Sequence, residues 1–146
     1  MRILVQRVRE GSVTIAGQLE AEIAVGLVLL VGVAKGDTAA DAAKLARKTA
    51  NLRIFDDEAG KMNLSLKDIG GTALAVSQFT LYANCSRGNR PSFDAAADQQ
   101  SARLLYEEYV SCLKAEGVAV QTGVFQAQML VAIANDGPVT ILLESP

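Results

Sequence analysis

The fold is decided by the stretch RILVQRVREGSVTIAGQLEAEIAVGLVLLVGV, which occupies residues 2–33. Its first part alternates apolar and polar residues and its last part is almost continuously apolar, and both patterns are typical of β-strands. Turn-forming pairs interrupt the pattern at Glu10–Gly11 and Gly17–Gln18. The sequence therefore predicts a meander of strands over Arg2–Arg9, Ser12–Ala16, Leu19–Val25 and Leu27–Val33.

Two segments further along the chain have the periodicity of helices. Thr38 and Asp41 have the spacing of a capping box and predict a helix that runs to about Ala50. The apolar face of this helix consists of Ala42, Leu45, Ala46 and Thr49. Apolar residues recur at helical spacing again between about Asp98 and Glu116, and Gly117 supplies a stop. We expect two helices.

The remaining segments read as strands and turns. Strands are predicted over Leu52–Phe55, Thr72–Leu81, Val118–Thr122, Gln128–Ala134 and Val139–Leu143, with turns at Asp56–Gly60 and Asn135–Pro138. Tyr82–Pro91 lacks periodicity and is expected to be a surface loop. The prediction is an α+β fold in which a curved or barrel-closed, mainly antiparallel or mixed sheet packs with two helices. Residues 1–146 should form a single domain, since no linker or repeat interrupts them.

The composition excludes several classes of function. Lys and Arg number 14 against 16 Asp and Glu, so the net charge of −2 gives no general attraction for phosphate backbones. The chain has no histidine, which excludes Ser-His-Asp and Cys-His catalysis and nearly all catalytic zinc sites. Cys85 and Cys112 lie far apart and form no metal or redox motif. We expect neither a metal nor a cofactor.

The location of the protein follows from its apolar segments and its cysteines. The longest apolar stretch, Ile23–Ala34, is shorter than the roughly 20 residues of a membrane span. Met1–Arg2–Ile3 opens directly into a strand pattern rather than a signal peptide. With two cysteines that show no CxxC spacing, these features predict a reduced, cytoplasmic protein that does not contact membranes.

Three clusters could carry chemistry, although each has an ordinary structural explanation. The cluster Ser77–Leu81 could be the polar end of a strand, but backbone N–H groups at Phe79 and Thr80 could also form an oxyanion hole, which needs no titratable group. The cluster Arg87–Phe93 could be a solvated basic loop or could bind phosphate through two arginines. On residue chemistry alone, Asn135–Thr140 is a hairpin turn.

Taken together, these clusters resemble one family along essentially the whole chain. The D-aminoacyl-tRNA deacylase (D-tyrosyl-tRNA deacylase) family of bacteria shows a similar order and spacing of motifs. The matching motifs are Gln6–Val8, Gly60–Asn63, Ser77–Leu81 (SQFTL), Arg87–Phe93, Thr122–Phe125 and Asn135–Thr140, which contains GPVT. The combination of SQFTL with GPVT is specific to this family in a way that neither motif is alone.

The resemblance implies a chiral proofreading enzyme. Members of this family hydrolyse the ester between a D-amino acid, or glycine mischarged on tRNA-Ala, and the terminal adenosine of tRNA. They release the free amino acid and tRNA and spare L-aminoacyl esters. They act as homodimers in which a cis Gly-Pro element of one subunit, here Gly137 and Pro138, enters the pocket of the other and blocks an L-side chain. The 2′-hydroxyl of the adenosine is thought to activate the attack, so a histidine is not needed.

The resemblance also implies roles for individual residues. Ser77, Gln78, Phe79 and Thr80 would line the catalytic ester site. For substrate binding and chiral selection, Phe125 and Met129 would contact the adenine or the amino acid, and Arg7 would hold Gly137–Pro138 in place. The expected tRNA contacts are Arg87, Arg90 and Lys61, and the expected partners are the acceptor end of D-aminoacyl-tRNA and a second copy of the chain.

Two alternatives stay open from the sequence. A sister deacylase with a trans Gly-Pro element would remove a different misattached amino acid, and the sequence before Pro138 does not determine the isomer. A non-catalytic RNA-end or DNA-binding dimer would use the same groove for binding alone.

Overall fold

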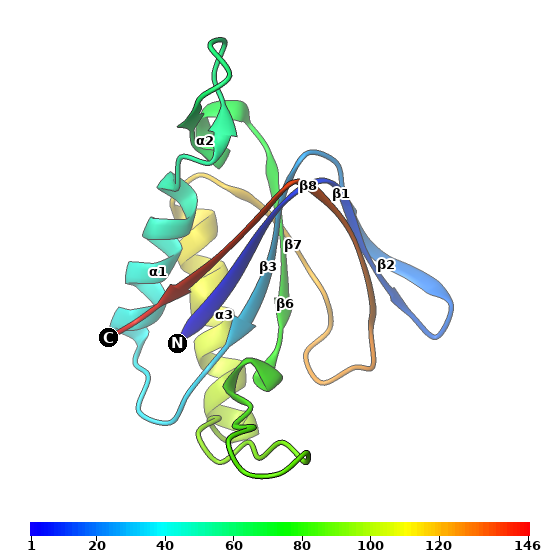
Figure 1. Ribbon diagram of the computed structural model, residues 1–146, viewed down its shortest axis with the longest axis vertical. Helices are drawn as coiled ribbons and strands as arrows, with labels where there is room; N and C mark the ends of the chain where they lie inside the picture. The colour runs from blue at the N-terminus through cyan, green and yellow to red at the C-terminus, as the bar shows by residue number, and fades with distance from the viewer.

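The computed structural model describes residues 1–146 as a mixed sheet packed against helices (Figure 1). Its strands are β1 (Arg2–Ile15), β2 (Gln18–Ile23), β3 (Gly26–Gly32), β4 (Phe55–Asp56), β5 (Met62–Leu64), β6 (Thr72–Ser77), β7 (Ala119–Thr122) and β8 (Leu130–Glu144). Its helices are α1 (Ala39–Asn51), α2 (Leu66–Ile69), the 3₁₀ helix η1 (Phe79–Tyr82) and α3 (Gln99–Ala115). The predicted α+β class with a curved, mixed sheet is confirmed.

The predicted turn at Glu10–Gly11 is wrong, because β1 continues through it as one long bent strand. A Cβ at Gly11 would lie 2.7 Å from Cγ2 of Val28, so glycine serves close packing across the sheet here rather than chain reversal. The first half of β1 pairs antiparallel with β3 and the second half with β2. The meander therefore contains three strands instead of four.

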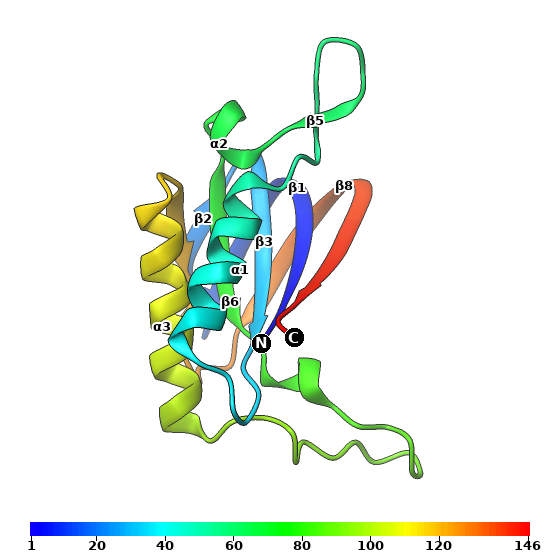
Figure 2. The same ribbon diagram turned by 90° about the vertical axis from the view of Figure 1, so that its left-hand side faces the viewer.

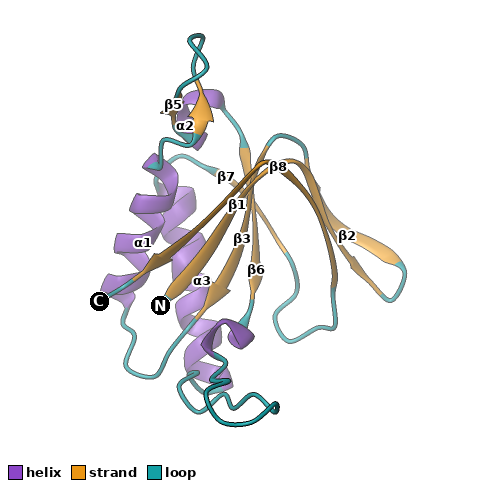
Figure 3. Cartoon of the chain, in the orientation of Figure 1, coloured by secondary structure: helices purple, strands orange, loops and turns teal.

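The predicted hairpin at Asn135–Pro138 is also wrong. β8 runs through these residues and pairs antiparallel with both halves of β1, from Arg2 opposite Glu144 to Thr14 opposite Leu130. The register shifts between Gln6 and Val8 and again between Val8 and Gly11. The turn-forming residues of β8 thus bend the strand pair where β1 also bends, as Figure 3 shows.

The sheet has the order β2-β1-β3-β6-β7, with β8 paired to β1. β6 is parallel to both β3 and β7, and the other pairs of this sheet are antiparallel. In the parallel ladder, Gly26 lies opposite Thr72 and Val31 opposite Ser77. β6 therefore extends between two ends of the sheet: one end holds the bend of β1 and β8, and the other holds η1.

Both predicted long helices are confirmed with nearly the predicted bounds. Thr38 caps α1 through the expected capping box with Asp41, and Asp98 caps α3 by accepting from Ser101 N. Gly117 follows α3 with φ of +91°, in the left-handed region that favours glycine. The structure also contains α2, a single turn with a capping box of its own, and η1, where the sequence predicted the end of a strand.

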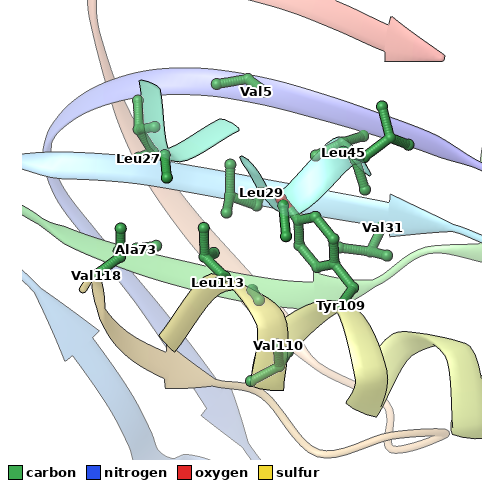
Figure 4. Close-up of a cluster of buried hydrophobic side chains, with 14 of the residues drawn as sticks. Val5, Leu27, Leu29, Val31, Leu45, Ala73, Tyr109, Val110, Leu113 and Val118 are labelled. Carbon is green, nitrogen blue, oxygen red and sulfur yellow. The ribbon is translucent and has the colours of Figure 1, made fainter. Parts of the chain in front are cut away.

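The main core lies between the sheet and the pair α1 and α3, which lie side by side on one face (Figures 1 and 2). Figure 4 shows Tyr109 of α3 among Leu29, Val31 and Leu45. Its hydroxyl lies 2.9 Å from Thr49 Oγ1, so the buried phenol has a hydrogen-bond partner. Burial raises the pKa of this phenol strongly. The helix layer thereby fixes the sheet, one end of which holds the bend of β1 and β8 and the other η1.

The other face of the sheet is covered only in part. A smaller cluster of buried residues lies there, made of Val8, Val13, Ala21, Ile23, Val28, Leu74 and Val76. Exposed apolar side chains elsewhere on the strands include Leu19, Leu130 and Leu142. None of the helices combines the length and the apolar character that a membrane crossing requires.

Candidate functional site

A cleft of about 770 Å³ opens where β3 and β6 end. Its walls come from the end of the sheet, the segment leading into α3 and the loop between β7 and β8. The lining residues are Val31, Val33, Val76, Ser77, Gln78, Phe79, Phe93, Ala96, Ala97, Asp98, Gln99, Ala102, Phe125, Gln126, Ala127, Met129 and Val131. Of the predicted site residues, the structure brings together Ser77, Gln78, Phe79, Phe125 and Met129 in one mostly apolar cleft.

The polar edge of this cleft is made by the chain as it leaves β6. Gln78 N donates to Val31 O at 2.8 Å, which ends the parallel ladder, and η1 begins at Phe79. The N–H groups of Phe79 and Thr80 belong to the first turn of this helix and therefore have no partner within it. Phe79 lines the cleft and Thr80 follows it in η1, so two adjacent backbone donors occur where the chain leaves the edge of the cleft.

Thr80 is the one predicted catalytic residue that does not line the cleft. Its side chain is exposed, and Gln78 Nε2 donates a hydrogen bond to its Oγ1. An amide N–H donates a hydrogen bond and cannot accept the hydroxyl proton, so this contact does not activate the hydroxyl as a nucleophile.

Asp98 is the only carboxylate that lines the cleft, and it caps α3. Its oxygens accept from Ser101 N at 3.0 Å and from Ser101 Oγ at 2.7 Å. The backbone hydrogen bond from Ser101, followed by the one from its side chain, lowers the pKa of Asp98. An anion held in this way is a weak general base at neutral pH. The chain has no group of three or more His, Cys, Asp or Glu residues that could hold a metal ion.

Aromatic rings form two walls of the cleft. Phe79 and Phe93 meet edge to face with centroids 5.0 Å apart, and Phe79 keeps 55% of its surface exposed. The second wall is Phe125, which lies 6.0 Å from the ring of Tyr106. Such walls suit a flat base or an aromatic side chain, which can stack or make edge contacts without an ordered partner charge.

The position of the Met129 side chain depends on Gly123. A Cβ at Gly123 would lie 2.6 Å from Met129 Sδ, so any larger residue would displace the thioether. This explains in packing terms why the segment Thr122–Phe125 contains glycine where β7 leaves the sheet.

The residues Gly137 and Pro138 lie at the bend of β8, joined by a cis peptide bond as the resemblance implies. Arg7, which is only 8% exposed, donates from Nε to Asp136 O at 3.1 Å. Gly137 has φ of +120°, and a Cβ there would lie 2.9 Å from Arg7 Nη2. Asn135 Nδ2 donates to Arg7 O and to Val139 O, both at 3.0 Å, and so fastens the two arms of the bend.

The structure separates this bend from the cleft of the same chain. Asn135 pairs with Val8, Val8 with Gly26, and Gly26 with Thr72, whereas the cleft begins at the other end of β6. The length of β6 is roughly 17 Å at a rise of about 3.3 Å per residue. Figure 1 shows the bend and η1 at opposite ends of the sheet. Gly137–Pro138 therefore does not line the cleft of its own chain.

The predicted tRNA contacts are divided between the same two ends. Arg87 and Arg90 lie on the exposed loop between η1 and Phe93, which is pinned by the two hydrogen bonds between Asn84 and Ser92. Lys61 lies on the β4–β5 hairpin, beyond the bend of β8 (Figures 1 and 2). The loop of the two arginines follows η1 and leads to Phe93 of the cleft, although neither arginine lines the cleft.

Among the cleft residues that the sequence did not predict as site residues are Phe93 and Asp98. Phe93 closes the RGNRPSF motif, and Asp98 is predicted from the sequence only as a helix start. The aromatic residue at the end of the motif is a signal that could have identified Phe93. No local pattern indicates that the cap of α3 faces the end of β6.

Comparisons with known proteins agree with this geometry. Residues 4–144 match the family described as D-Tyr-tRNA(Tyr) deacylase. A D-aminoacyl-tRNA deacylase of Chlorobaculum tepidum is 57% identical, with 100% of this chain and 98% of that protein covered. One of Thermomicrobium roseum is 59% identical, with 99% and 94% covered.

A solved structure shares the fold over the whole chain. The chain superposes on a c-Myc DNA Unwinding Element Binding Protein with a TM-score of 0.94 and 39% identity, covering 100% of this chain and 99% of the other. Because the family match and the relatives extend over nearly the whole chain, this chain belongs to the D-Tyr-tRNA(Tyr) deacylase family.

Proposed function

We propose that the protein hydrolyses the ester bond of D-aminoacyl-tRNA and spares the L-esters. The observation that carries this proposal is the mostly apolar cleft at the end of β6, which Phe79 lines at the point where η1 begins. Relatives that share more than half of the sequence carry the name D-aminoacyl-tRNA deacylase. We include glycyl-tRNA mischarged on tRNA-Ala as a substrate because glycine has no side chain for a steric filter to reject.

The cleft supplies electrostatic stabilisation but no strong base. During hydrolysis, a water oxygen bonds to the ester carbonyl carbon, the bond to the ribose oxygen breaks, and the proton of the water ends on that ribose oxygen. The N–H groups of Phe79 and Thr80 stabilise the oxyanion of the intermediate. Thr80 accepts a hydrogen bond from Gln78, and Asp98 is held as a capping anion. As the resemblance to the family implies, we assign the activation of the water to the 2′-hydroxyl of the terminal adenosine.

Discrimination between enantiomers requires a rigid steric barrier, or wall, in the substrate pocket. Enantiomers have the same groups and the same transfer free energies, so only shape and directed hydrogen bonds can separate them. A thousandfold preference corresponds to about 4 kcal/mol. Gly137–Pro138 is fastened by Arg7 and Asn135, which gives it the rigidity of such a wall. Since it lies at the far end of the sheet from the cleft of its own chain, it serves the cleft of a second copy.

A second copy would find an exposed face of β8 next to the bend. Val139, Ile141 and Leu143 of β8 belong to or pack against the helix-covered core, so the alternation of a strand turns Thr140 and Leu142 to the opposite face. Leu142 is 48% exposed there. We propose that this face forms the homodimer, with Arg87 and Arg90 beside each cleft contacting the acceptor end of the tRNA. The cytoplasmic location stays a prediction.

A turnover assay tests this function. Matched D-tyrosyl-tRNA, L-tyrosyl-tRNA and glycyl-tRNA are offered to the protein, and the mass of the particle is measured by light scattering in the same buffer. We expect cleavage of the D- and glycyl-esters by a dimer, with the L-ester spared. Equal rates on both tyrosyl esters, or full activity of a monomer, would contradict the proposal.

A second candidate function comes from the name of the similar solved structure, which describes a protein that binds a DNA unwinding element. On that view the chain would bind nucleic acid through the same groove without turnover. The net charge of −2 argues against broad binding to a phosphate backbone. The same assay distinguishes the two functions, because a binding protein would retain D-tyrosyl-tRNA and leave its ester intact.

A further inference from the structure

Arg7 joins the bend of β8 to a second projecting element, the β4–β5 hairpin. Its Nη1 donates to Ile54 O at 2.8 Å, directly before β4, while its Nε donates to Asp136 O at 3.1 Å. Nη1 also lies 3.6 Å from Asp56 Oδ1 on β4. A guanidinium is planar and holds its donors in fixed directions. The hairpin base and the bend are therefore fixed relative to each other and move together.

The tip of this hairpin is an ordered turn rather than a free loop. Asp57 N donates to Lys61 O at 2.8 Å, and Gly60 N donates to Asp57 O at 2.9 Å. Asp57 Oδ1 accepts from the backbone N–H groups of Lys61 at 3.0 Å and Ala59 at 2.9 Å. These hydrogen bonds lower the pKa of Asp57, and the one from the Lys61 backbone has the largest effect. The tip thus presents its outward side chains from a defined backbone.

Charge at the hairpin is already partly neutralised. Asp56 forms an ion pair with Arg7, and the carboxylate of Asp57 accepts hydrogen bonds from the backbone of the turn. Lys61 is exposed and has no ion pair, and Glu58 is the remaining exposed carboxylate of the tip. Lys61 is therefore a cation that is free to meet an anion from outside the chain.

Lys61 is out of reach of the reacting ester in the cleft of its own chain. The hairpin lies at the bend end of the sheet, and the cleft lies at the other end of β6, roughly 17 Å further along. Figure 2 shows the hairpin projecting away from the loop that carries Arg87 and Arg90. A lysine side chain does not span this separation.

We propose that Lys61 contacts a phosphate of the tRNA bound in the cleft of the partner subunit. This inference rests on the proposed function, in which Gly137–Pro138 enters that same cleft. Because Arg7 ties the hairpin to the bend, the hairpin accompanies Gly137–Pro138 to the partner. Each acceptor end is then held by Arg87 and Arg90 of one subunit and by Lys61 of the other.

The first experiment compares substrates with and without phosphates. Lys61→Glu should raise KM for D-tyrosyl-tRNA about fivefold, the upper end for one screened ion pair. It should leave cleavage of D-tyrosyl-adenosine, which has no phosphate, unchanged. Glu58→Gln on the same turn should lower KM for the tRNA. Equal effects of Lys61→Glu on both substrates, or no effect on either, would overturn the proposal.

Mixed dimers then decide which subunit provides the lysine. Phe79→Pro removes one proposed oxyanion donor at the first position of η1, where proline is tolerated, and inactivates the cleft of the chain that carries it. In the first dimer, one chain carries both Phe79→Pro and Lys61→Glu and the other is wild type. In the second dimer, the two substitutions lie on different chains.

The two dimers have the same composition, so only the arrangement differs. We expect the raised KM in the first dimer, whose active cleft faces the altered hairpin, and the KM of a dimer carrying Phe79→Pro alone in the second. The reverse result would overturn the proposal and leave the hydrolase intact. Failure of the proposed function would show earlier, as wild-type protein that cleaves neither D-ester.

Discussion

The two ends of the sheet are built differently. At the bend of β1 and β8, Arg7 is 8% exposed and reaches Ile54 O and Asp136 O, so the backbone there is fastened on several sides. At the end of β6, the chain encloses a cleft of about 770 Å³, and Phe79 is 55% exposed. One end is a rigid projection and the other is a cleft open to a ligand. Because they lie at opposite ends, the bend and the cleft do not meet within one chain.

The largest effect is expected at the rigid end. Arg7→Met removes charged hydrogen bonds to Ile54 O and Asp136 O, and we expect a loss of about 3 kcal/mol in the free energy of unfolding. Urea denaturation measures this loss. Arg9→Met is the matched control, because the Arg9 side chain is 79% exposed and pairs with the same Asp136 at 3.2 Å. The control should lose less than about 1 kcal/mol, and equal losses would remove the distinction between the two ends.

The next largest effect is expected at the cleft, where a substitution should lower activity and leave the free energy of unfolding nearly unchanged. Phe79→Ala removes an exposed ring that forms one wall with Phe93. We expect kcat/KM for D-tyrosyl-tRNA to fall about tenfold, or about 1.4 kcal/mol. The unfolding free energy should change by less than about 1 kcal/mol, because the ring is half exposed already. A large loss of stability with unchanged kcat/KM would show that the ring is part of the core.

Thr80→Ala tests whether the protein or the substrate provides the chemistry. We expect the rate of D-tyrosyl-tRNA cleavage to stay within about threefold, because Thr80 has no base beside it. Single-turnover kinetics measure this rate. A D-tyrosyl-tRNA that ends in 2′-deoxyadenosine is the counterpart and should not be cleaved. An acyl-enzyme trapped on Thr80 would contradict substrate-assisted hydrolysis.

The smallest effect concerns the basic loop beside the cleft. Replacing both Arg87 and Arg90 by alanine should flatten the slope of log KM against log salt by about 0.7 for each arginine. Wild type should itself show a shallow slope, since few phosphates can reach this loop. Lys48→Ala, on the last turn of α1, is the control and should leave the slope unchanged. A steep slope that persists without the arginines would place the tRNA elsewhere.

The local signals of the sequence predicted the helices well. The capping box of Thr38 and Asp41 and the stop at Gly117 determine helix ends through neighbouring residues, so a linear pattern contains them. The same reasoning failed at Glu10–Gly11 and Asn135–Pro138. Their composition is that of turns, but β1 and β8 continue through these residues as strands that pair with each other. Because β1 and β8 pair with each other along their length, residues typical of chain reversals form a bend that the two strands share.

The site was predicted residue by residue but not as a geometry. The clusters around Phe79 and Phe125 lie together in the cleft, which the joint family resemblance implied. That Gly137 lies at the other end of β6 depends on the register of three strand pairs, which no local pattern encodes. Asp98 was missed as a cleft residue for the same reason.

In the proposed function, the Gly137–Pro138 wall of a partner subunit distinguishes D-aminoacyl from L-aminoacyl esters. The direct measurement is the ratio of kcat/KM for D- and L-tyrosyl-tRNA in a Pro138→Ala variant that light scattering shows to be a dimer. We expect this ratio to fall at least tenfold, or about 1.4 kcal/mol, while cleavage of the D-ester persists. An unchanged ratio in the folded dimer would contradict the claim.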